Sequence, residues 1–466
     1  MYSLSYLSGN GVNMMTLLQA AEAGALEVVK ALIEQKANLE DHDQAGWTPL
    51  TAAAAVGHTE TLSVLIDAKA NINPRDDLNY TPLLLAAHEG RLACVQLLLT
   101  AKADIKATNT AGQTALMLAA IHNHVNCVQQ LFDVNADINA KGIEGQTALM
   151  MASREGRDES VQLLLELNAD VDAMDNEGST ALLIATSYDH VACVGTLIAA
   201  NADVNSMNHT AGSAVMTAAK GGHFDCLQLL VDANADINIE DETGWTPLMW
   251  TSGNGNFEDT ELLINANANI DARDEDDMTA LMHAAAEDHD DCVRLLIDAN
   301  ADIEAKTNTL KTALIMAAVS GHVDSVQLLV EAKADLEARD RDGFTALLVS
   351  ATNDDNIDCL QLLIDANADI EARDKDASTV VMIAAAYRSA NCMRRLLERR
   401  VDFYATNNTG LNLLMIAAAR LPAVDVRLII DLVIALLERG GQQQEGSTDE
   451  SDSDAPSQPR AKRMRR

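Results

Sequence analysis

The chain has few aromatic residues, few basic residues and no long apolar segment. Its 466 residues include 3 Trp, 6 Tyr and 5 Phe, and these aromatic residues make up only 3% of the sequence. The longest late apolar run, 428–437, is interrupted by Asp431 and is too short to span a bilayer. No basic stretch followed by an apolar segment opens the chain. The sequence therefore predicts a soluble protein without a membrane segment or a secretory signal.

Basic residues are scarce relative to acidic ones. The chain has 33 Lys and Arg against 70 Asp and Glu, which gives a formal net charge of -37. Acidic and basic residues are equal in number after Gly440, so the preceding residues carry the whole excess. This charge argues against nucleic acid as a ligand and favours a basic protein as partner. The alternative is that turn-forming Asp and solvated helix surfaces accumulate acid for solubility alone.

One pattern dominates what the sequence does contain. A threonine recurs every 33 residues, and a serine fills the one gap in the series, at Thr48, Thr81, Thr114, Thr147, Thr180, Ser213, Thr246, Thr279, Thr312 and Thr345. A one-residue insertion near 353–356 moves the next member to Thr379, and degenerate copies are centred on Met15 and Asn412. A fixed period of this size indicates an array of stacked units, because one unit of 33 residues cannot bury its own apolar face.

Each unit predicts two helices. A turn, the recurring hydroxyl residue and then Pro or Ala, as in Gly244-Trp245-Thr246-Pro247, is typical of a helix start. A break about nine residues later separates a second helix with a Val-Gln-Leu-Leu type of stripe. Asn in sequences such as Ala-Asn-Ala-Asp-Ile ends that helix, because Asn is the best substitute for Gly in a left-handed cap.

These features resemble the ankyrin repeat, whose period is also 33 residues. The resemblance covers residues 13–440 in about thirteen repeats, and it implies an all-α helical-repeat solenoid with short β-hairpin turns between repeats. We expect residues 1–12 to be a flexible N-terminus and 441–466 to be a disordered Ser-rich and acidic tail that ends in a basic cluster. Two features depart from the family. Its Thr-Pro-Leu-His motif has no His here, and its Gly before Ala-Asp is absent within the array. We interpret both as apolar packing in place of polar capping.

The cysteines and histidines follow the same register, which argues against a catalytic or metal site. The seven cysteines share the position thirteen residues after the threonine, so we expect buried thiols that act as small hydrophobic side chains. Six histidines share a loop position that Arg91 and Arg157 fill elsewhere, which predicts a role in loop hydrogen bonding. The one compact ligand-like group, His122, His124 and Cys127, lacks a fourth ligand. We therefore predict no enzyme activity, no metal and no cofactor.

Five aromatic residues are candidates for partner binding. The family resemblance implies that hairpin tips and first helices form a concave face that binds another protein. The residue before the threonine is expected to point toward this face, and Trp250 lies on the first helix of the same repeat as Trp245; the candidates are Trp47, Tyr80, Trp245, Trp250 and Phe344. Rigid aromatic anchors often dominate interface energy. The alternative is that these rings pack on the neighbouring hairpin.

The C-terminal region offers further candidates. The helix expected over 424–437 is apolar nearly all round, so it either folds back on its own repeat or is covered by a second copy in a homodimer. Thr448, Ser451 and Ser453 are followed by acids and resemble kinase sites. The basic end resembles a nuclear localisation signal or could contact the acidic face, through Lys462, Arg463, Arg465 and Arg466. We expect a nuclear or cytoplasmic location.

The leading hypothesis is a non-enzymatic interaction scaffold or adaptor. Its acidic concave face would bind another protein through a basic segment. The alternative is a substrate-recognition subunit of an enzyme complex, such as a ligase or phosphatase. The resemblance also implies hydroxylation of hairpin Asn residues, for which Asn139 is the candidate.

Overall fold

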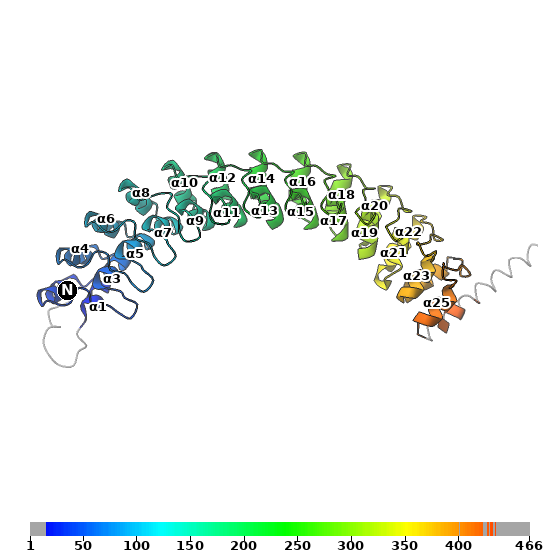
Figure 1. Ribbon diagram of the computed structural model, residues 1–466, viewed down its shortest axis with the longest axis horizontal. Coiled ribbons are helices and arrows are strands. Elements are labelled where there is room, and N and C mark those ends of the chain that lie inside the picture. The colour runs from blue at the N-terminus through cyan, green and yellow to red at the C-terminus, as the bar shows by residue number, and fades with distance from the viewer. Residues whose placement is uncertain (1–14, 400, 423–425, 428, 432–433, 435–466) are drawn as a thin grey trace, which may run out of the picture. The chain divides into compact units, whose positions relative to one another are not determined.

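The computed structural model describes residues 15–399, 401–422, 426–427, 429–431 and 434. These residues fall into two compact units. The first unit comprises the described residues up to Thr251, together with the segment Asn256–Asn269. The second unit comprises Ser252–Gly255 and the described residues from Ile270 onwards. Each unit consists of helix pairs joined by loops (Figure 1), so the all-α repeat solenoid predicted from the sequence is confirmed.

The helices alternate between two structural roles. The first helix of each repeat is α1 (Leu17–Glu22), α3 (Pro49–Val56), α5 (Pro82–His88), α7 (Ala115–Ile121), α9 (Ala148–Arg154), α11 (Ala181–Ser187), α13 (Ala214–Gly221), α15 (Pro247–Gly253), α17 (Ala280–Ala286), α19 (Ala313–Ser320), α21 (Ala346–Ser350), α23 (Val380–Tyr387) or α25 (Leu413–Arg420). The second helix is α2 (Leu26–Glu34), α4 (Thr59–Asp67), α6 (Leu92–Thr100), α8 (Val125–Asp133), α10 (Asp158–Glu166), α12 (Val191–Ala199), α14 (Phe224–Asp232), α16 (Phe257–Asn265), α18 (Asp290–Asp298), α20 (Val323–Glu331), α22 (Ile357–Asp365) or α24 (Ala390–Leu397). We number the repeats by these pairs, so α15 and α16 form repeat 8 and α17 and α18 form repeat 9.

Within each unit, like helices pack on like helices. In the first unit, α1 packs on α3 and so on to α13, and α2 packs on α4 and so on to α16. The second unit repeats this arrangement from α17 to α25 and from α18 to α24. The core lies between the two rows and consists largely of Ala, Leu and Val side chains that recur in register. Each repeat therefore buries its apolar face against its neighbours.

The recurring threonines begin the first helices, as predicted. Thr246 Oγ1 accepts the N–H of Met249 at 3.4 Å, and the same bond recurs at the other described members of the series from Thr48 to Thr345. Thr379 is an exception, because its buried Oγ1 has no hydrogen-bond partner. The first helix is capped by Thr16, one residue after the Met15 that the period predicts.

The replacement of the family histidine by methionine is only partly an exchange for apolar packing. The N–H of Thr114 donates to Met117 Sδ at 3.4 Å, and the N–H of Thr246 donates to Met249 Sδ at the same distance. The thioether thus supplies a weak acceptor at the helix start. The interpretation from the sequence missed this contact, because it treated methionine as purely apolar.

Left-handed residues end the second helices, as the sequence predicts. Asn135, Asn168 and Asn201 have φ of 62°, and Lys69 and Lys333 adopt the same region at 71° and 72°. This conformation disfavours residues with a Cβ, and Asn tolerates it best after Gly. A reversal then brings the chain to the loop between repeats.

A ladder of side-chain to backbone bonds connects the repeats beside these reversals. Asn139 Oδ1 accepts the N–H of Asp170 at 2.9 Å, and the equivalent bond recurs 31 residues apart along the array, with Glu40, Asn73, Asp172, Asn205, Asn238, Asp271, Glu304 and Glu371 as acceptors. Lys106, in the loop between repeats 3 and 4, takes this position and has no acceptor atom in its side chain. Part of the acidic excess therefore has a structural purpose.

The insertion in repeat 11 is accommodated locally. Helix α21 is short, and a 3₁₀ turn, η1 (Asp354–Asn356), follows it. Asn356 Nδ2 donates to the carbonyl oxygens of Ala318 and Val319, at 2.9 and 3.0 Å. The inserted residue therefore leaves the connection to the preceding repeat intact.

The predicted terminal helix over 424–437 is described only in part. Residues 426–427, 429–431 and Ile434 are helical, with Ile429 buried and Ile430 and Ile434 exposed. Its pairing with a second copy stays a prediction. None of the helices in the described residues has the length and apolar character needed to span a lipid bilayer.

Candidate protein-binding surface

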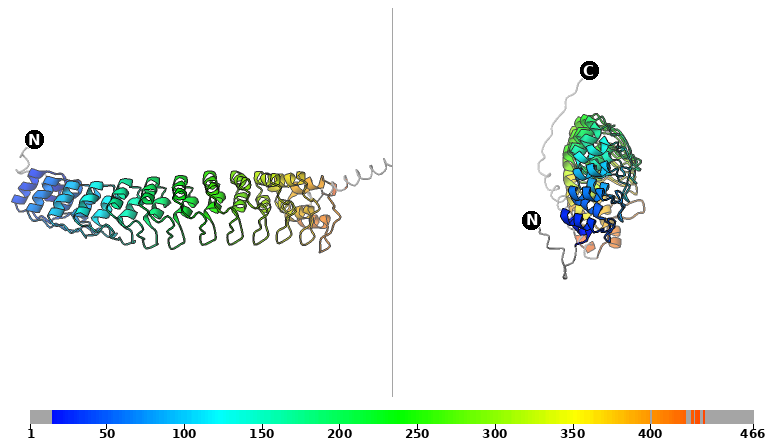
Figure 2. Two further views of the ribbon diagram at one scale, coloured as in Figure 1. Left: turned by 90° about the horizontal axis from the view of Figure 1, so that it is seen from above. Right: turned by 90° about the vertical axis from the view of Figure 1, so that its left-hand side faces the viewer.

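The loops between repeats and the adjoining exposed side of the first helices form what we call the hairpin-side surface. In each unit the loops lie along one edge (Figure 2). Successive loop tips are linked by backbone bonds, for example from Asp77 N–H to Ala45 O at 3.1 Å and from Arg341 N–H to Thr309 O at 2.8 Å. The loops show isolated antiparallel bridges, such as Met207 with Ser213, as expected for short hairpin turns. Side chains on this surface are thus held at regular intervals.

A polar turn residue five positions before the threonine organises most of the loops, and Gly142 is an exception. In repeat 8, Asp241 Oδ1 accepts the N–H groups of Thr243 and Trp245 at 2.9 and 3.1 Å. In repeat 9, Asp274 Oδ1 accepts those of Asp276 and Met278 at 2.9 and 2.8 Å. Asp is favoured in turns because its carboxylate can accept such local N–H bonds. This geometry leaves the second carboxylate oxygen available to the first helix.

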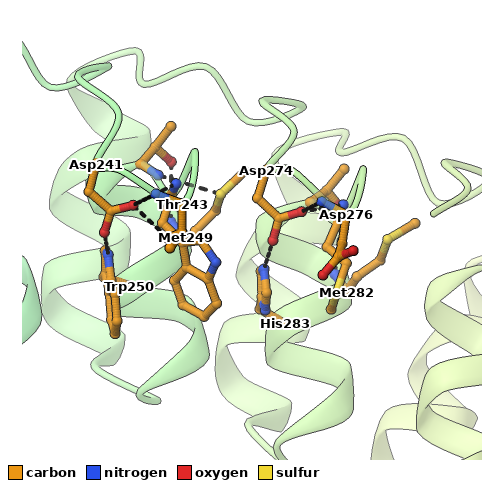
Figure 3. Close-up of polar contacts among 12 residues, drawn as sticks. Asp241, Thr243, Met249, Trp250, Asp274, Asp276, Met282 and His283 are labelled. Atoms are coloured by element: carbon orange, nitrogen blue, oxygen red, sulfur yellow. Dashed lines mark hydrogen bonds and ion pairs between the residues drawn. The ribbon is translucent and has the colours of Figure 1, made fainter. Parts of the chain in front are cut away.

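In repeat 8 that second oxygen holds a tryptophan and a lysine. Asp241 Oδ2 accepts Nε1–H of Trp250 at 3.0 Å (Figure 3). The same oxygen lies 3.0 Å from Lys220 Nζ. The ammonium group of Lys220 is also 4.3 Å from the centroid of the Trp250 ring. The Trp245 and Trp250 rings are 4.4 Å apart between centroids, with their planes tilted by 44°. We call these four residues the tryptophan cluster.

The tryptophan cluster combines a largely buried anion with an exposed cation. The side chain of Asp241 is 9% exposed, whereas that of Lys220 is 42% exposed. Burial alone would raise the pKa of Asp241, but hydrogen bonds from Thr243, Lys220 and Trp250 outweigh it and hold the pKa below its usual range. The carboxylate is therefore ionised throughout the neutral range, and both indole rings remain half-buried at the surface.

Repeat 9 shows the same register with different chemistry. Asp274 Oδ2 lies 2.9 Å from Nε2 of His283, and both side chains are buried (Figure 3). His283 stands four residues after Thr279, as Trp250 stands four residues after Thr246. Burial lowers the pKa of His283 although the nearby Asp274 opposes the shift. A neutral imidazole that donates to the carboxylate fits this arrangement.

The other aromatic candidates lie outside the tryptophan cluster. Trp47 Nε1–H donates to Asp76 Oδ2 of the next loop at 3.2 Å, which is the neighbour packing that the sequence left open as an alternative. The Tyr80 ring meets the His88 ring edge-on, with centroids 6.3 Å apart. Phe344 is half-buried in the loop before α21. Of the five candidates, the structure thus brings Trp245 and Trp250 into one site.

Sequence reasoning missed Asp241 and Lys220. The register carries a signal for Asp241, because a turn Asp recurs five residues before the threonine. Lys220 lies 26 residues before Thr246 in the preceding repeat, and no spacing within one repeat connects it to Trp250. Only the packing of repeat 7 against repeat 8 identifies this neighbour.

On the opposite side of the helix pairs, the recurrent loop residues serve the array itself. The Nε2 atoms of His58, His124, His190 and His322 lie 2.8–3.0 Å from a carbonyl oxygen of the preceding repeat. Arg91 and Arg157 donate Nε–H to the equivalent carbonyl groups at 3.2 and 2.9 Å. The predicted role in loop hydrogen bonding is confirmed for these residues. Their interchange shows that a donor is needed there and that imidazole chemistry is not.

The cysteine series is buried, as predicted. All seven cysteines are buried thiols, and burial raises the pKa of Cys127 to about 11. Such thiols are poor nucleophiles and poor metal ligands at neutral pH. In the described part of the chain, no group of three or more His, Cys, Asp and Glu side chains could hold a metal ion. The His122 and His124 rings are 6.1 Å apart between centroids.

Repeat 8 breaks the cysteine series with a carboxyl group. Asp259 occupies the position that Cys226 and Cys292 occupy in the repeats on either side, and it is 3% exposed. Its Oδ1 atom is buried without a hydrogen-bond partner. Burial, with the charge of Glu258, raises the pKa of Asp259 to about 6. In repeat 5 the same position holds Ser160, which donates to Asn123 Oδ1 of the preceding repeat.

The remaining candidate sites stay predictions. Asn139 is exposed, and its side chain is a rung of the ladder between repeats. The kinase sites and the basic end all lie outside the described residues: Thr448, Ser451, Ser453, Lys462, Arg463, Arg465 and Arg466.

A family comparison agrees with the repeat architecture. The family model described as "Ankyrin repeats (3 copies)" matches overlapping segments that run from residue 17 to residue 444. The crystal structure of the human ASB11 ankyrin repeat domain is similar at 26% sequence identity, over 47% of this chain and 96% of that chain, with a TM-score of 0.42. No match was found among curated proteins. Ankyrin repeats are protein-protein interaction modules and are generally not catalytic. The chain belongs to the ankyrin repeat family.

Proposed function

We propose that this protein is a non-enzymatic adaptor that holds a basic segment of another protein on the hairpin-side surface of repeats 7 and 8. The tryptophan cluster is the observation that supports this most directly. The centroids of two indole rings are 4.4 Å apart beside a largely buried carboxylate, and a cation already lies over one of the rings. Large aromatic side chains in such settings are the residues that most often dominate interface energy.

The charge around the tryptophan cluster favours a basic partner. Glu240 and Glu242 are exposed on either side of Asp241 in the loop. While Lys220 is in place, the oxygens of Asp241 are engaged by the turn, Trp250 and Lys220, so these two glutamates are the carboxylates that an approaching partner meets first. Complementary charge increases the rate of encounter and selects against acidic proteins.

Replacing both rings tests the proposal. The Trp245→Ala/Trp250→Ala variant should bind a labelled hexalysine peptide about 30-fold more weakly, which corresponds to about 2 kcal/mol. Phe224→Ala is the matched control, because Phe224 is an exposed aromatic residue at the start of second helix α14. Fluorescence anisotropy gives the affinities, and circular dichroism verifies that each variant is folded.

Capture from native lysate extends the test to natural partners. The proposal expects basic proteins to be retained by the native chain and by Phe224→Ala, and to be lost with the double Trp variant. Equal retention by all three chains would contradict it. Co-purification of a ligase or phosphatase catalytic subunit would identify the adaptor as the substrate-recognition subunit of that enzyme.

A further inference from the structure

Lys220 occupies a cation site that the rest of the tryptophan cluster builds without it. Asp241, Trp245 and Trp250 all belong to repeat 8, whereas Lys220 is in the last turn of α13 in repeat 7. The turn bonds fix Asp241 Oδ1, and the bond from Trp250 Nε1–H to Oδ2 fixes the ring relative to the carboxylate. The carboxylate and the ring are therefore positioned by contacts in which Lys220 has no part.

The ammonium group of Lys220 makes the contacts that an external alkylammonium ligand would make. It lies over the face of an indole ring and within ion-pair distance of a carboxylate. A cation above tryptophan is attracted by the ring quadrupole, and the carboxylate adds a charge-assisted hydrogen bond. The face of the Trp250 ring and the Asp241 carboxylate thus both favour a positive group that bears N–H donors.

Lys220 is also able to leave. Its side chain is 42% exposed and consists of a flexible four-carbon stem, so the ammonium group can return to water by rotation about its own bonds. Departure would leave Asp241 with its turn bonds and its bond to Trp250. The Asp241 carboxylate would then have an oxygen available to a new donor.

A lysine at this position is specific to one repeat. The residue seven positions after the threonine is neutral in most repeats, as at Ile121, Ser187 and Gly253, and basic at His88 and Arg154; only Lys220 is a lysine there. Repeat 9 forms the same turn-carboxylate pair with His283 in place of Trp250. The lysine and the two tryptophans therefore occur together only at the junction of repeats 7 and 8.

We propose that Lys220 is an exchangeable internal ligand, which a lysine side chain of the partner displaces from the site formed by Asp241, Trp245 and Trp250. This proposal rests on the proposed function of the same surface. Lys220 competes with every incoming cation. The apparent affinity of the site for an external cation is therefore its intrinsic affinity multiplied by the fraction of molecules in which Lys220 has left the site. It selects for partners whose remaining contacts outweigh this competition.

A small alkylammonium ion tests the exchange directly. The probe is n-butylammonium, with n-butanol as the neutral control of the same chain length. In a Trp47→Phe background the tryptophan fluorescence comes only from Trp245 and Trp250, because the chain has 3 Trp. Lys220→Met removes the charge and keeps most of the stem. Lys306→Met removes one charge from an exposed lysine elsewhere and serves as the matched control.

Removal of the internal ligand should strengthen binding. We expect n-butylammonium to bind Lys220→Met about tenfold more tightly than the parent and Lys306→Met. Asp241→Asn should abolish this gain, and the turn should tolerate Asn because Asn208 forms the same bonds in repeat 7. Equal affinity in Lys220→Met and the parent, absence of saturable binding, or equal response to n-butanol would each overturn the proposal.

The two proposals can fail separately. If lysate capture depends on Trp245 and Trp250 but Lys220→Met gains nothing, the partner-binding surface stands and the exchange is wrong. If Lys220→Met binds n-butylammonium more tightly but capture is unchanged by loss of both rings, the cation site stands and its role in partner binding is wrong.

Discussion

Repeats 8 and 9 place polar side chains at the same two positions but form an open site in one repeat and a closed pair in the other. Both place an aspartate in the turn and a donor four residues after the threonine. In repeat 9 the donor is His283, and the pair is closed and buried. In repeat 8 the donor is Trp250, and the pair opens onto a second ring and a lysine. The turn and the helix start are common requirements of the fold, so the side chain that the first helix presents determines whether a binding site forms.

The second helices extend this comparison. Repeat 9 has Cys292 at the buried position near the helix start, and repeat 8 has Asp259. A buried thiol needs no strong partner, whereas a buried carboxyl group does. Repeat 8 therefore differs from repeat 9 at both ends of its helix pair. It has a cation site on the hairpin-side surface, and it has an unpaired carboxyl oxygen of Asp259 near the loop between its two helices.

The largest expected effect comes from making repeat 8 resemble repeat 9. Asp259→Cys should stabilise the protein at pH 7 by about 3 kcal/mol at most, because a pKa raised from 3.8 to about 6 is a shift of about two units at 1.36 kcal/mol each. Urea unfolding followed by circular dichroism measures the change.

The sign of this effect depends on pH. Folded Asp259 holds its proton more strongly than the unfolded chain, so native stability falls as pH rises from about 4 to about 6. The gain from Asp259→Cys should therefore be largest above pH 6 and shrink toward pH 4. The reverse change, Cys292→Asp, should destabilise the protein most at neutral pH. A gain independent of pH would mean that packing, and not charge, explains the difference.

The second test opens the closed pair of repeat 9. His283→Ala leaves Asp274 Oδ2 buried without its donor, which should cost about 2 kcal/mol at pH 7. His283→Gln keeps a donor and should lose less. Urea midpoints of the two variants and the parent measure the difference. Equal losses would show that the hydrogen bond contributes little.

The same residue predicts a pH dependence. Burial lowers the pKa of folded His283 below its unfolded value of 6.5. The unfolded chain then binds the proton more strongly, so this contribution to stability is complete above pH 6.5 and is lost as pH falls. His283→Gln should remove that part of the pH dependence between pH 7 and pH 5.

The smallest expected effect concerns the ladder position, where most repeats carry a side-chain acceptor. Lys106 interrupts the ladder that Asn73 and Asn139 continue on either side. Lys106→Asn supplies an acceptor for the N–H of Asp137 and should stabilise the protein by about 0.5–1 kcal/mol. Lys106→Ala serves as the control for loss of the charge. A gain equal to that of the control would remove the evidence for a new bond.

Much of the fold could be predicted from the sequence. The period located the helix starts from Thr48 to Thr345, and the shared register explained the buried cysteines and the loop histidines. The exceptions are local. The residue that caps the first helix is Thr16 and not Met15, and methionine sulfur atoms act as acceptors at helix starts. Neither detail changes the spacing of apolar residues, so the period could not reveal it.

The candidate site was predicted only in part. Trp245 and Trp250 were identified because aromatic residues are scarce and both lie near one threonine. Trp47 was chosen on the same grounds, yet its indole N–H is bound by the next loop. The position before the threonine faces both the neighbouring loop and the solvent, so its residue type does not determine which contact forms.

The sequence by itself determined that this is an array of helix pairs, because a single unit of 33 residues must bury its apolar face against similar neighbouring units. It also determined where each repeated side chain would stand within its own repeat. Only the tertiary structure decided which side chains of adjacent repeats meet, such as Lys220 with Trp250 and Asn139 with Asp170. These contacts between repeats depend on how one repeat is rotated and shifted against the next, and no spacing within a repeat specifies that rotation.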